Sequence, residues 1–347
     1  MNIFKNKFLM ASILFLAALF LFNYFAVIIK SSSFENKLDA IMPSDKENFN
    51  FSKAIFNVTK LVDKDMDLNW CQTELANLTH DLKAEIGDEA NPELRVKIFN
   101  NFMFKEKGFH YNERAKNYFM YKIPDKDVSN DEFMSYFTVS SLLKTGEGVC
   151  LSLSVLYLML AEQLDLPIYG SILPGHIFVR YIEDGRSRIN IDPAGNGLEF
   201  YHYDEAFKID LNSANGSIFG KKASNYSVLG TYIYNLSLIC KRMKRMGDAE
   251  ILLKKAAEIN PGDADVLYEL GNSLYEKGKY KEAAEQYAES INLYPDHSYA
   301  YSGLGACLFM MNQYDDAEKN VNEALRLDKN NLHAQYWRDR IFKGKKQ

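Results

Sequence analysis

A chain of 347 residues is long enough for two folded domains, and a composition of 47% hydrophobic and 25% charged residues excludes a disordered protein. Its net charge of −5 at pH 7 gives no general attraction to phosphate backbones, which argues against nucleic-acid binding. The four cysteines lack the tight spacing of a disulfide framework or a zinc site.

The N-terminal segment is the most apolar part of the chain. Residues 8–29 carry no charge over 22 positions, which is enough to cross roughly 30 Å of hydrocarbon. We therefore predict an uncleaved membrane anchor over residues 1–30. A cleaved signal peptide is the alternative, but the apolar run is long for one and ends without a small-residue cleavage site. A short basic N-terminus most often stays inside, so the body is expected on the outer side.

Apolar residues recur at helical spacing after a polar stretch over residues 31–50, which is expected to be a tether. Helices are predicted over residues 51–62 and 71–86. Asn91 followed by proline marks the start of a third helix, which continues to about residue 104.

Residues 109–131 break the helical pattern and predict a long loop, a kind of segment that is often functional. His110 in this loop is expected to be structural or solvated rather than catalytic. Several aromatic side chains are expected to pack on the domain surface, with the lining of a cleft as the alternative: Tyr111, Tyr118, Phe119 and Tyr121.

The centre of the chain predicts two helices and then a small sheet. Residues 133–144 have helical spacing, and residues 150–164 are apolar almost all round, as expected of a helix buried in a core. Alternation and turn residues then predict three strands, the last two joined by a hairpin turn at 183–186: residues 168–173, 177–182 and 188–192.

Three side chains at the ends of these elements could carry chemistry. Cys150 follows a glycine-bearing loop at the first turn of the core helix, where unpaired N–H groups and the helix dipole favour a thiolate. His176 begins one strand and Asp192 ends its antiparallel neighbour, so both are expected at the same end of the hairpin. Attack on an amide needs a thiolate, a ring that moves a proton and a carboxylate that orients the ring. The sequence therefore predicts a Cys150–His176–Asp192 site.

Each of these residues also has a structural interpretation. Cys150 alone could be a buried helix cysteine, His176 a structural histidine, and Asp192 a cap at a strand end. The hypothesis rests on all three occurring in this order. The backbone N–H of Cys150 supplies one candidate donor for an oxyanion, and the residues do not identify a second.

Residues 230–331 contain three copies of a 34-residue repeat, in which leucines and alanines superpose: Leu236, Leu270 and Leu304, and Ala249, Ala283 and Ala317. This period and pattern resemble the tetratricopeptide repeat, whose helix pairs stack into a curved solenoid with a concave binding face. Residues 332–347 are expected to form a capping helix and a tail.

The sequences Gly-Val-Cys-Leu-Ser at 148–152, Leu-Pro-Gly-His at 173–176 and Ile-Asp-Pro at 191–193 resemble the bacterial transglutaminase-like proteins, a branch of the papain-like thiol superfamily. The resemblance covers roughly residues 75–203. It implies an α+β fold with a Cys-His-Asp site that transfers an acyl group from an amide to water or to an amine. It implies no metal or organic cofactor. The chain departs from better-studied transglutaminases in lacking a tryptophan after the cysteine.

These expectations give an α+β papain-like domain with an all-α tetratricopeptide solenoid after it and a transmembrane helix before it. The segments are an anchor (1–30), a tether (31–50), the transglutaminase-like domain (51–229), three repeats (230–331) and a cap (332–347).

The function expected is a membrane-anchored, cysteine-dependent acyl-transfer enzyme on the periplasmic side of a bacterial inner membrane. Residues 8–29 would hold it to the membrane, and the repeats would recruit a protein or peptide partner. The alternatives are a non-catalytic protein-binding scaffold and an envelope assembly factor that uses the repeats. Hydrolysis and transamidation both stay open, as does the oligomeric state.

Overall fold

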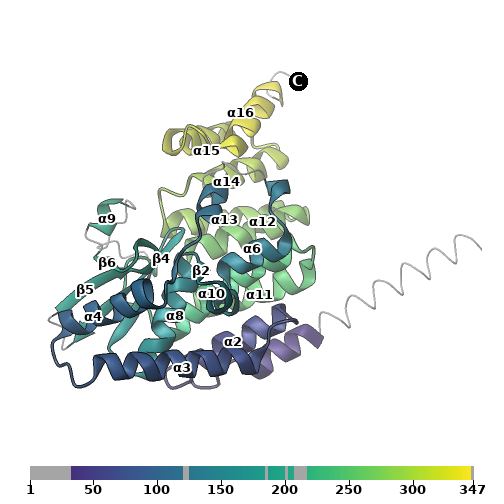
Figure 1. Ribbon diagram of the computed structural model, residues 1–347. Helices are drawn as coiled ribbons and strands as arrows, with labels where there is room; N and C mark the ends of the chain where they lie inside the picture. The colour runs from purple at the N-terminus through teal and green to yellow at the C-terminus, as the bar shows by residue number, and fades with distance from the viewer. Residues whose placement is uncertain (1–32, 120–124, 184–186, 200–201, 207–216, 345–347) are drawn as a thin grey trace, which may run out of the picture.

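A computed structural model describes residues 33–119, 125–183, 187–199, 202–206 and 217–344. Helices surround a small sheet in the first part of the chain, and a stack of helix pairs follows (Figure 1). The last helix, α16 (Leu332–Gly344), lies at the end of the stack farthest from the sheet.

The predicted transmembrane helix is corrected by the structure. No helix in the described part of the chain is long and apolar enough to cross a bilayer. The apolar core helix α8 (Cys150–Gln163) has 14 residues, fewer than the roughly 20 that a bilayer requires. The longer α3 (Leu68–Ile86) carries Glu74, Asp81 and Lys83 along its length. Residues 8–29, on which the prediction rested, lie outside the described residues. The membrane anchor and the periplasmic location that followed from it are therefore withdrawn.

Part of the stretch expected to be a tether packs on the body. Residues 33–41 are helical, and Leu38 is fully buried in the main core. The helix α2 (Phe51–Val62) follows with the predicted bounds, and Asn50 caps its N-terminus. Glu162, near the end of α8, accepts a hydrogen bond from Ser52 N at 3.0 Å, so the first helices are fixed to the core helix.

The next two predicted helices are present with shifted ends. Helix α3 begins at Leu68, where Asp67 accepts from Trp70 N. Helix α4 (Pro92–Asn101) begins with the predicted Asn91 cap and a proline in its first turn, and it continues as the π-helical turn η1 (Phe102–Glu106). The capped start at Asn91 was therefore predictable from the sequence, but the change of helix type at Phe102 was not.

The long loop predicted over residues 109–131 is wrong. The segment holds short elements in this order: β1 (His110–Tyr111), α5 (Glu113–Phe119), η2 (Asp125–Asp127) and the start of α6 (Asn130–Phe137). The prediction of a single helix over 133–144 is also wrong, because the structure has two helices there, α6 and α7 (Val139–Thr145). They break at Thr138, whose backbone is extended and whose hydroxyl donates to Ser141 Oγ at 2.9 Å, a local bond that competes with helix formation.

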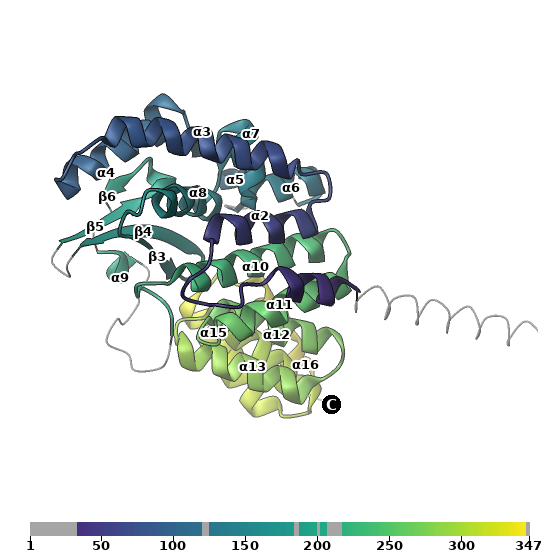
Figure 2. The same ribbon diagram turned by 90° about the horizontal axis from the view of Figure 1, so that it is seen from below.

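The core helix α8 lies against a four-stranded antiparallel sheet. The strands pair in the order β3 (Ile168–Leu173), β4 (His176–Glu183), β5 (Ser187–Asp192) and β6 (Leu198–Glu199). Every α8 residue from 151 to 161 is buried. Figure 2 shows α8 between this sheet and helices α3 and α4. Since each fully buried Leu or Val contributes roughly 1.5–3 kcal/mol, burial of α8 stabilises the domain strongly.

The repeats form antiparallel helix pairs, with a short α9 (Tyr203–Ala206) before them. Gly271 and Gly303 lie where a side chain would collide with Tyr287, so these two glycines let neighbouring helices approach the buried ring. The pairs are α10 (Asn225–Arg242) with α11 (Met246–Ile259), α12 (Ala264–Glu276) with α13 (Tyr280–Leu293), and α14 (Ser298–Met310) with α15 (Tyr314–Leu327).

The first repeat helix also belongs to the core of the preceding domain. Tyr232 of α10 is fully buried, and its hydroxyl lies 2.8 Å from Thr59 Oγ1 of α2. Because Thr59 donates its own proton to Ile55 O, Tyr232 is the donor in this pair. One continuous hydrophobic cluster therefore joins residues of α2, α8, α10 and α12.

Candidate active site

The chain around Cys150 is fixed by hydrogen bonds just before α8. Ser152 Oγ accepts from Val149 N at 3.0 Å and donates to Tyr136 O at 3.0 Å. A side chain at Gly148 would collide with Ser152 Oγ, so this close approach requires glycine. Cys150 is the first residue of α8 and is partly exposed, and the first N–H groups of a helix have no partner within it.

His176 is the first residue of β4 and pairs with Leu173 across a tight turn. Gly175 in this turn has φ +65°, a conformation that favours glycine. The His176 side chain is 15% exposed, so the turn holds the ring in a fixed, mostly buried position.

Asp192 is the last residue of β5, at the same end of the sheet as His176. Its Oδ1 atom lies 3.4 Å from His176 Nε2 and also accepts from Ala194 N at 3.0 Å, at the start of the 3₁₀ turn η3 (Pro193–Gly195). Asp192 is thus a cap at the strand end and a partner of the histidine ring at once, so the two interpretations of this residue are compatible.

The charges around His176 favour its protonated form. Burial lowers the pKa of the ring, but hydrogen bonds to Asp192 and Cys150 and the charges of both groups outweigh it and raise the pKa to about 10. The ring therefore carries a proton at neutral pH. The structure brings the three predicted side chains together, and their catalytic role stays a prediction.

Tyr111 lies at the same site and was assigned only a packing or cleft role from the sequence. It is in β1, where it pairs with Gly148 of β2 (Glu147–Gly148) in parallel. Burial and the charges of Cys150 and Asp192 raise the pKa of its phenol. No local pattern in the sequence marks Tyr111, because its position depends on β1 pairing with the loop before Cys150, more than thirty residues away.

His110, next to Tyr111, is exposed as predicted and does not join the three site residues. Its Nδ1 atom is 2.8 Å from Gly108 O, and Nε2 is 3.6 Å from Glu147. Among the residues that the structure describes, no group of three or more His, Cys, Asp or Glu side chains is arranged to hold a metal ion.

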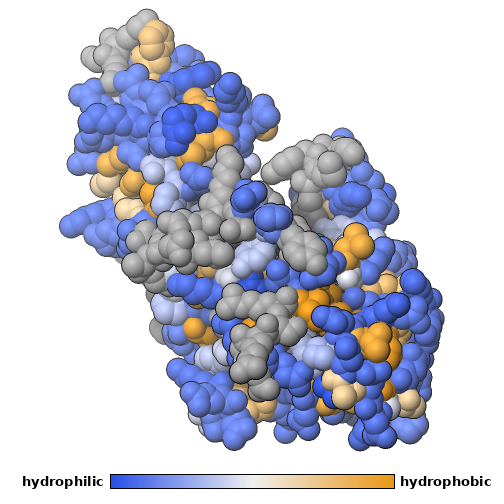
Figure 3. Space-filling model, turned by 90° about the vertical axis from the view of Figure 1, so that its left-hand side faces the viewer, coloured by the Kyte–Doolittle hydropathy of each residue, from blue (hydrophilic) through white to orange (hydrophobic). Residues whose placement is uncertain are grey.

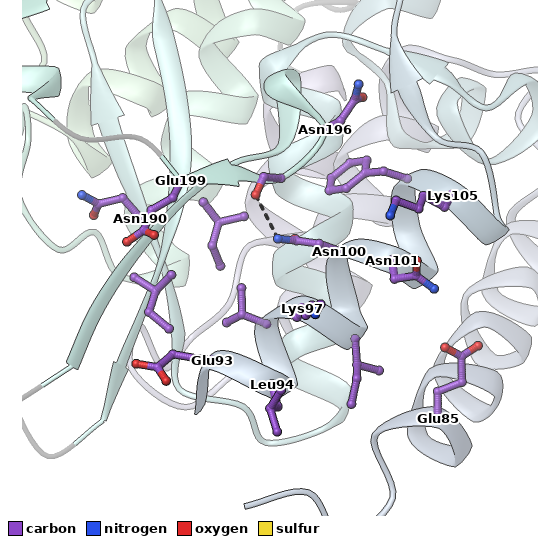
Figure 4. A pocket seen from close by; sticks show the side chains of 16 residues that line it. Glu85, Glu93, Leu94, Lys97, Asn100, Asn101, Lys105, Asn190, Asn196 and Glu199 are labelled. Atoms are coloured by element: carbon purple, nitrogen blue, oxygen red, sulfur yellow. Dashed lines mark hydrogen bonds between the residues drawn. The ribbon is translucent and has the colours of Figure 1, made fainter. Parts of the chain in front are cut away.

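A groove of about 1100 Å³ lies beside the turn that follows Asp192; Ile191 and Asn196 line it, whereas Cys150, His176 and Asp192 do not (Figure 4). Its walls are α4 with η1 on one side and β5 with β6 on the other. Asn100 crosses it and donates to Gly197 O at 2.9 Å. Figure 3 views the side of the molecule on which β5 and β6 lie, where apolar patches alternate with hydrophilic surface. The groove shows the same mixture of apolar, amide and charged side chains.

The second repeat touches the turn before His176. Gly175 N donates to Asp265 Oδ2 of α12 at 3.3 Å, and Asp265 Oδ1 lies 3.3 Å from His297 Nε2 at the start of α14. The second helix pair of the repeats therefore lies beside the candidate site.

Comparison with known families agrees with this arrangement. The model of the transglutaminase-like superfamily matches residues 69–215, and models of the tetratricopeptide repeat match residues 231–263 and 262–330. The chain carries a transglutaminase-like domain followed by tetratricopeptide repeats. Both resemblances seen in the sequence are confirmed.

Two relatives match different shares of the chain. The UPF0162 protein of Buchnera aphidicola subsp. Schizaphis graminum is 22% identical over 224 residues, which cover 62% of this chain and 78% of that protein. Mitochondrial import receptor subunit TOM34 of Pongo abelii is 37% identical over 95 residues, 26% of this chain. The match covers 31% of that TOM34, so the chain spans about a third of its length.

Solved structures similar to the chain are of tetratricopeptide proteins. One is the first such domain of Spaghetti (RPAP3) bound to an HSP90 peptide, which is 17% identical. The match covers 34% of this chain and 94% of that one, with a TM-score of 0.33.

Proposed function

We propose that the transglutaminase-like domain is a cysteine-dependent acyl-transfer enzyme that acts on amide bonds. The observation that carries the proposal is the meeting of Cys150, His176 and Asp192, with the His176 ring 3.4 Å from Asp192 and hydrogen-bonded to Cys150.

The first half of the reaction forms a thioester. The Cys150 thiolate bonds to the carbonyl carbon, and the carbonyl oxygen takes the negative charge. The carbon–nitrogen bond then breaks while His176 gives its proton to the leaving nitrogen. A protonated ring at neutral pH suits this step.

The second half releases the acyl group. His176 removes a proton from water or from an acceptor amine, which attacks the thioester carbon. The carbon–sulfur bond breaks, and the thiolate and the protonated ring return. Asp192 keeps the ring oriented throughout and stabilises its charge.

Alkylation by iodoacetamide tests the proposal. Cys71, Cys240 and Cys307 are fully buried, so selective labelling of Cys150 follows from exposure alone and does not decide the question. The decisive comparison is at pH 6, where well under about 1% of an ordinary thiol is ionised. We expect rapid labelling of Cys150 at pH 6 and a loss of at least about tenfold in His176→Ala.

The matched control is His110→Ala, which removes an exposed ring from β1 and is expected to leave the rate unchanged. Equal rates for the wild type and His176→Ala at pH 6 would contradict the enzymatic proposal. That result would favour the alternative, a scaffold that binds a protein partner through the concave face of its repeats.

A further inference from the structure

The strand β1 places one aromatic residue beside the reacting groups. Tyr111 pairs with Gly148, two residues before Cys150, and Asn112 N donates to Gly148 O at 2.8 Å. The same strand packs against α8 and against η3, the turn that follows Asp192. The backbone of Tyr111 is therefore held between the start of α8, which carries Cys150, and the turn η3, which follows Asp192.

The phenol of Tyr111 is held as a hydrogen-bond donor. Its ring is half-buried against the core, and the charges of Cys150 and Asp192 both act on its phenol. Burial and these negative charges raise its pKa, so the O–H stays intact at neutral pH. Within the described part of the chain, no residue shares a hydrogen bond with this hydroxyl.

Attack of the Cys150 thiolate on an amide carbonyl requires a hydrogen-bond donor of this kind. The carbonyl oxygen becomes negative when the thiolate adds, and two donors are usually arranged to stabilise it. The Cys150 N–H at the start of α8 supplies one. Neither tryptophan of the chain suits the second position, because Trp337 donates its indole to His333 in α16 and Trp70 lies beside Lys144 at the start of α3.

We infer that the Tyr111 hydroxyl donates the second hydrogen bond to the oxyanion that forms when Cys150 attacks an amide carbonyl. The inference rests on the proposed function and deepens it. The hydroxyl donates to the oxygen while the tetrahedral intermediate exists and keeps its proton when the carbonyl reforms. Tyr111 therefore acts only in steps that pass through a charged carbonyl oxygen.

Two reactions of the same thiol separate this role from a structural one. Alkylation by iodoacetamide displaces iodide at a saturated carbon and forms no oxyanion, whereas acylation by p-nitrophenyl acetate does form one. In Tyr111→Phe we expect acylation of Cys150 to slow by about 10- to 1000-fold, with alkylation within about twofold of the wild type. Release of nitrophenolate and mass mapping of the acetylated cysteine give the acylation rate.

Tyr118→Phe is the matched control, because it removes a phenol on the neighbouring helix α5, which donates to Asp125 of η2 at 2.7 Å. It is expected to leave both rates unchanged. Thermal unfolding midpoints show that each variant is folded.

The outcomes distinguish the two proposals. Unchanged acylation in Tyr111→Phe, or an equal loss of both rates, would overturn the role of Tyr111 while leaving the Cys150–His176 pair intact. A wild type that alkylates without dependence on His176 and does not acylate at all would overturn the proposed function and this inference together.

Discussion

The transglutaminase-like domain and the repeats are assembled in opposite ways. In the domain, the candidate site joins the start of α8, the start of β4 and the end of β5, with β1 beside them, so its geometry depends on contacts between distant segments. In the repeats, Tyr287 packs against glycines of its own and the next helix pair, and the same contact pattern recurs along the chain. A destabilising substitution in the domain should therefore affect the whole domain, whereas one in the repeats should affect mainly the neighbouring helices.

The largest expected effect is in the repeats. Tyr287→Ala removes a ring that is 2% exposed and should cost about 3–5 kcal/mol. We expect thermal unfolding to split into two transitions, with iodoacetamide labelling of Cys150 slowed after the first by no more than the few-fold that loss of the Asp265 contact would cause. Tyr287→Phe, which loses only the 2.7 Å bond to Asn272, should cost about 1 kcal/mol. A single transition in Tyr287→Ala would show that the repeats and the domain unfold as one unit.

The second effect is a pH dependence specific to the domain. The pKa of His176 is about 10 in the folded protein and 6.5 ordinarily, so the protonated ring stabilises the folded state. Its contribution to the free energy of unfolding is complete below about pH 6.5 and is lost as pH rises through about 10. The effect is on the order of a few kcal/mol. The urea concentration at the unfolding midpoint should decrease more from pH 6.5 to pH 10 in the wild type than in His176→Gln. Parallel falls in the two proteins would contradict the raised pKa.

The smallest effect tests the contact between the two regions. Asp265→Ala removes the acceptor for Gly175 N, an exposed hydrogen bond of 3.3 Å, and should lower the free energy of unfolding by less than about 1 kcal/mol. If the repeats position the turn before His176, the same variant should slow labelling of Cys150 at pH 6 by a few-fold. Asp265→Asn should restore part of the rate, because it keeps an oxygen acceptor.

Asp296→Ala, which removes a carboxylate beside His297 in the next repeat, is the control and should change nothing. An unchanged rate in Asp265→Ala would show that the site is independent of the repeats.

Local patterns carried most of what the sequence predicted correctly. The capped start at Asn91, the apolar helix after Cys150 and the leucine and alanine positions of the repeats all depend on residues close in the chain. The hairpin also placed His176 and Asp192 at one end, because the side-chain period of a strand and the turn between strands fix that relation.

The errors arose where distant contacts decide the structure. Residues 109–131 showed no regular period, yet β1 forms because it pairs with the loop before Cys150, which lies more than thirty residues away. The break at Thr138 is supported by Val149 N donating to Tyr136 O at 3.2 Å, a bond that no helical pattern reveals. The role inferred for Tyr111 was hidden for the same reason.

Helix α10 has a consequence for how the chain can be divided. Its Tyr232 sits among residues of α2 and donates to Thr59 there, although α10 is the first helix of the repeats. A truncation at residue 230 would leave a cavity lined by apolar atoms in the shortened protein, and Thr59 would lose the hydrogen bond that its hydroxyl accepts from Tyr232. Helix α10 thus completes the core of the transglutaminase-like domain. The smallest part of the chain that contains Cys150 and can fold on its own therefore extends at least to Arg242.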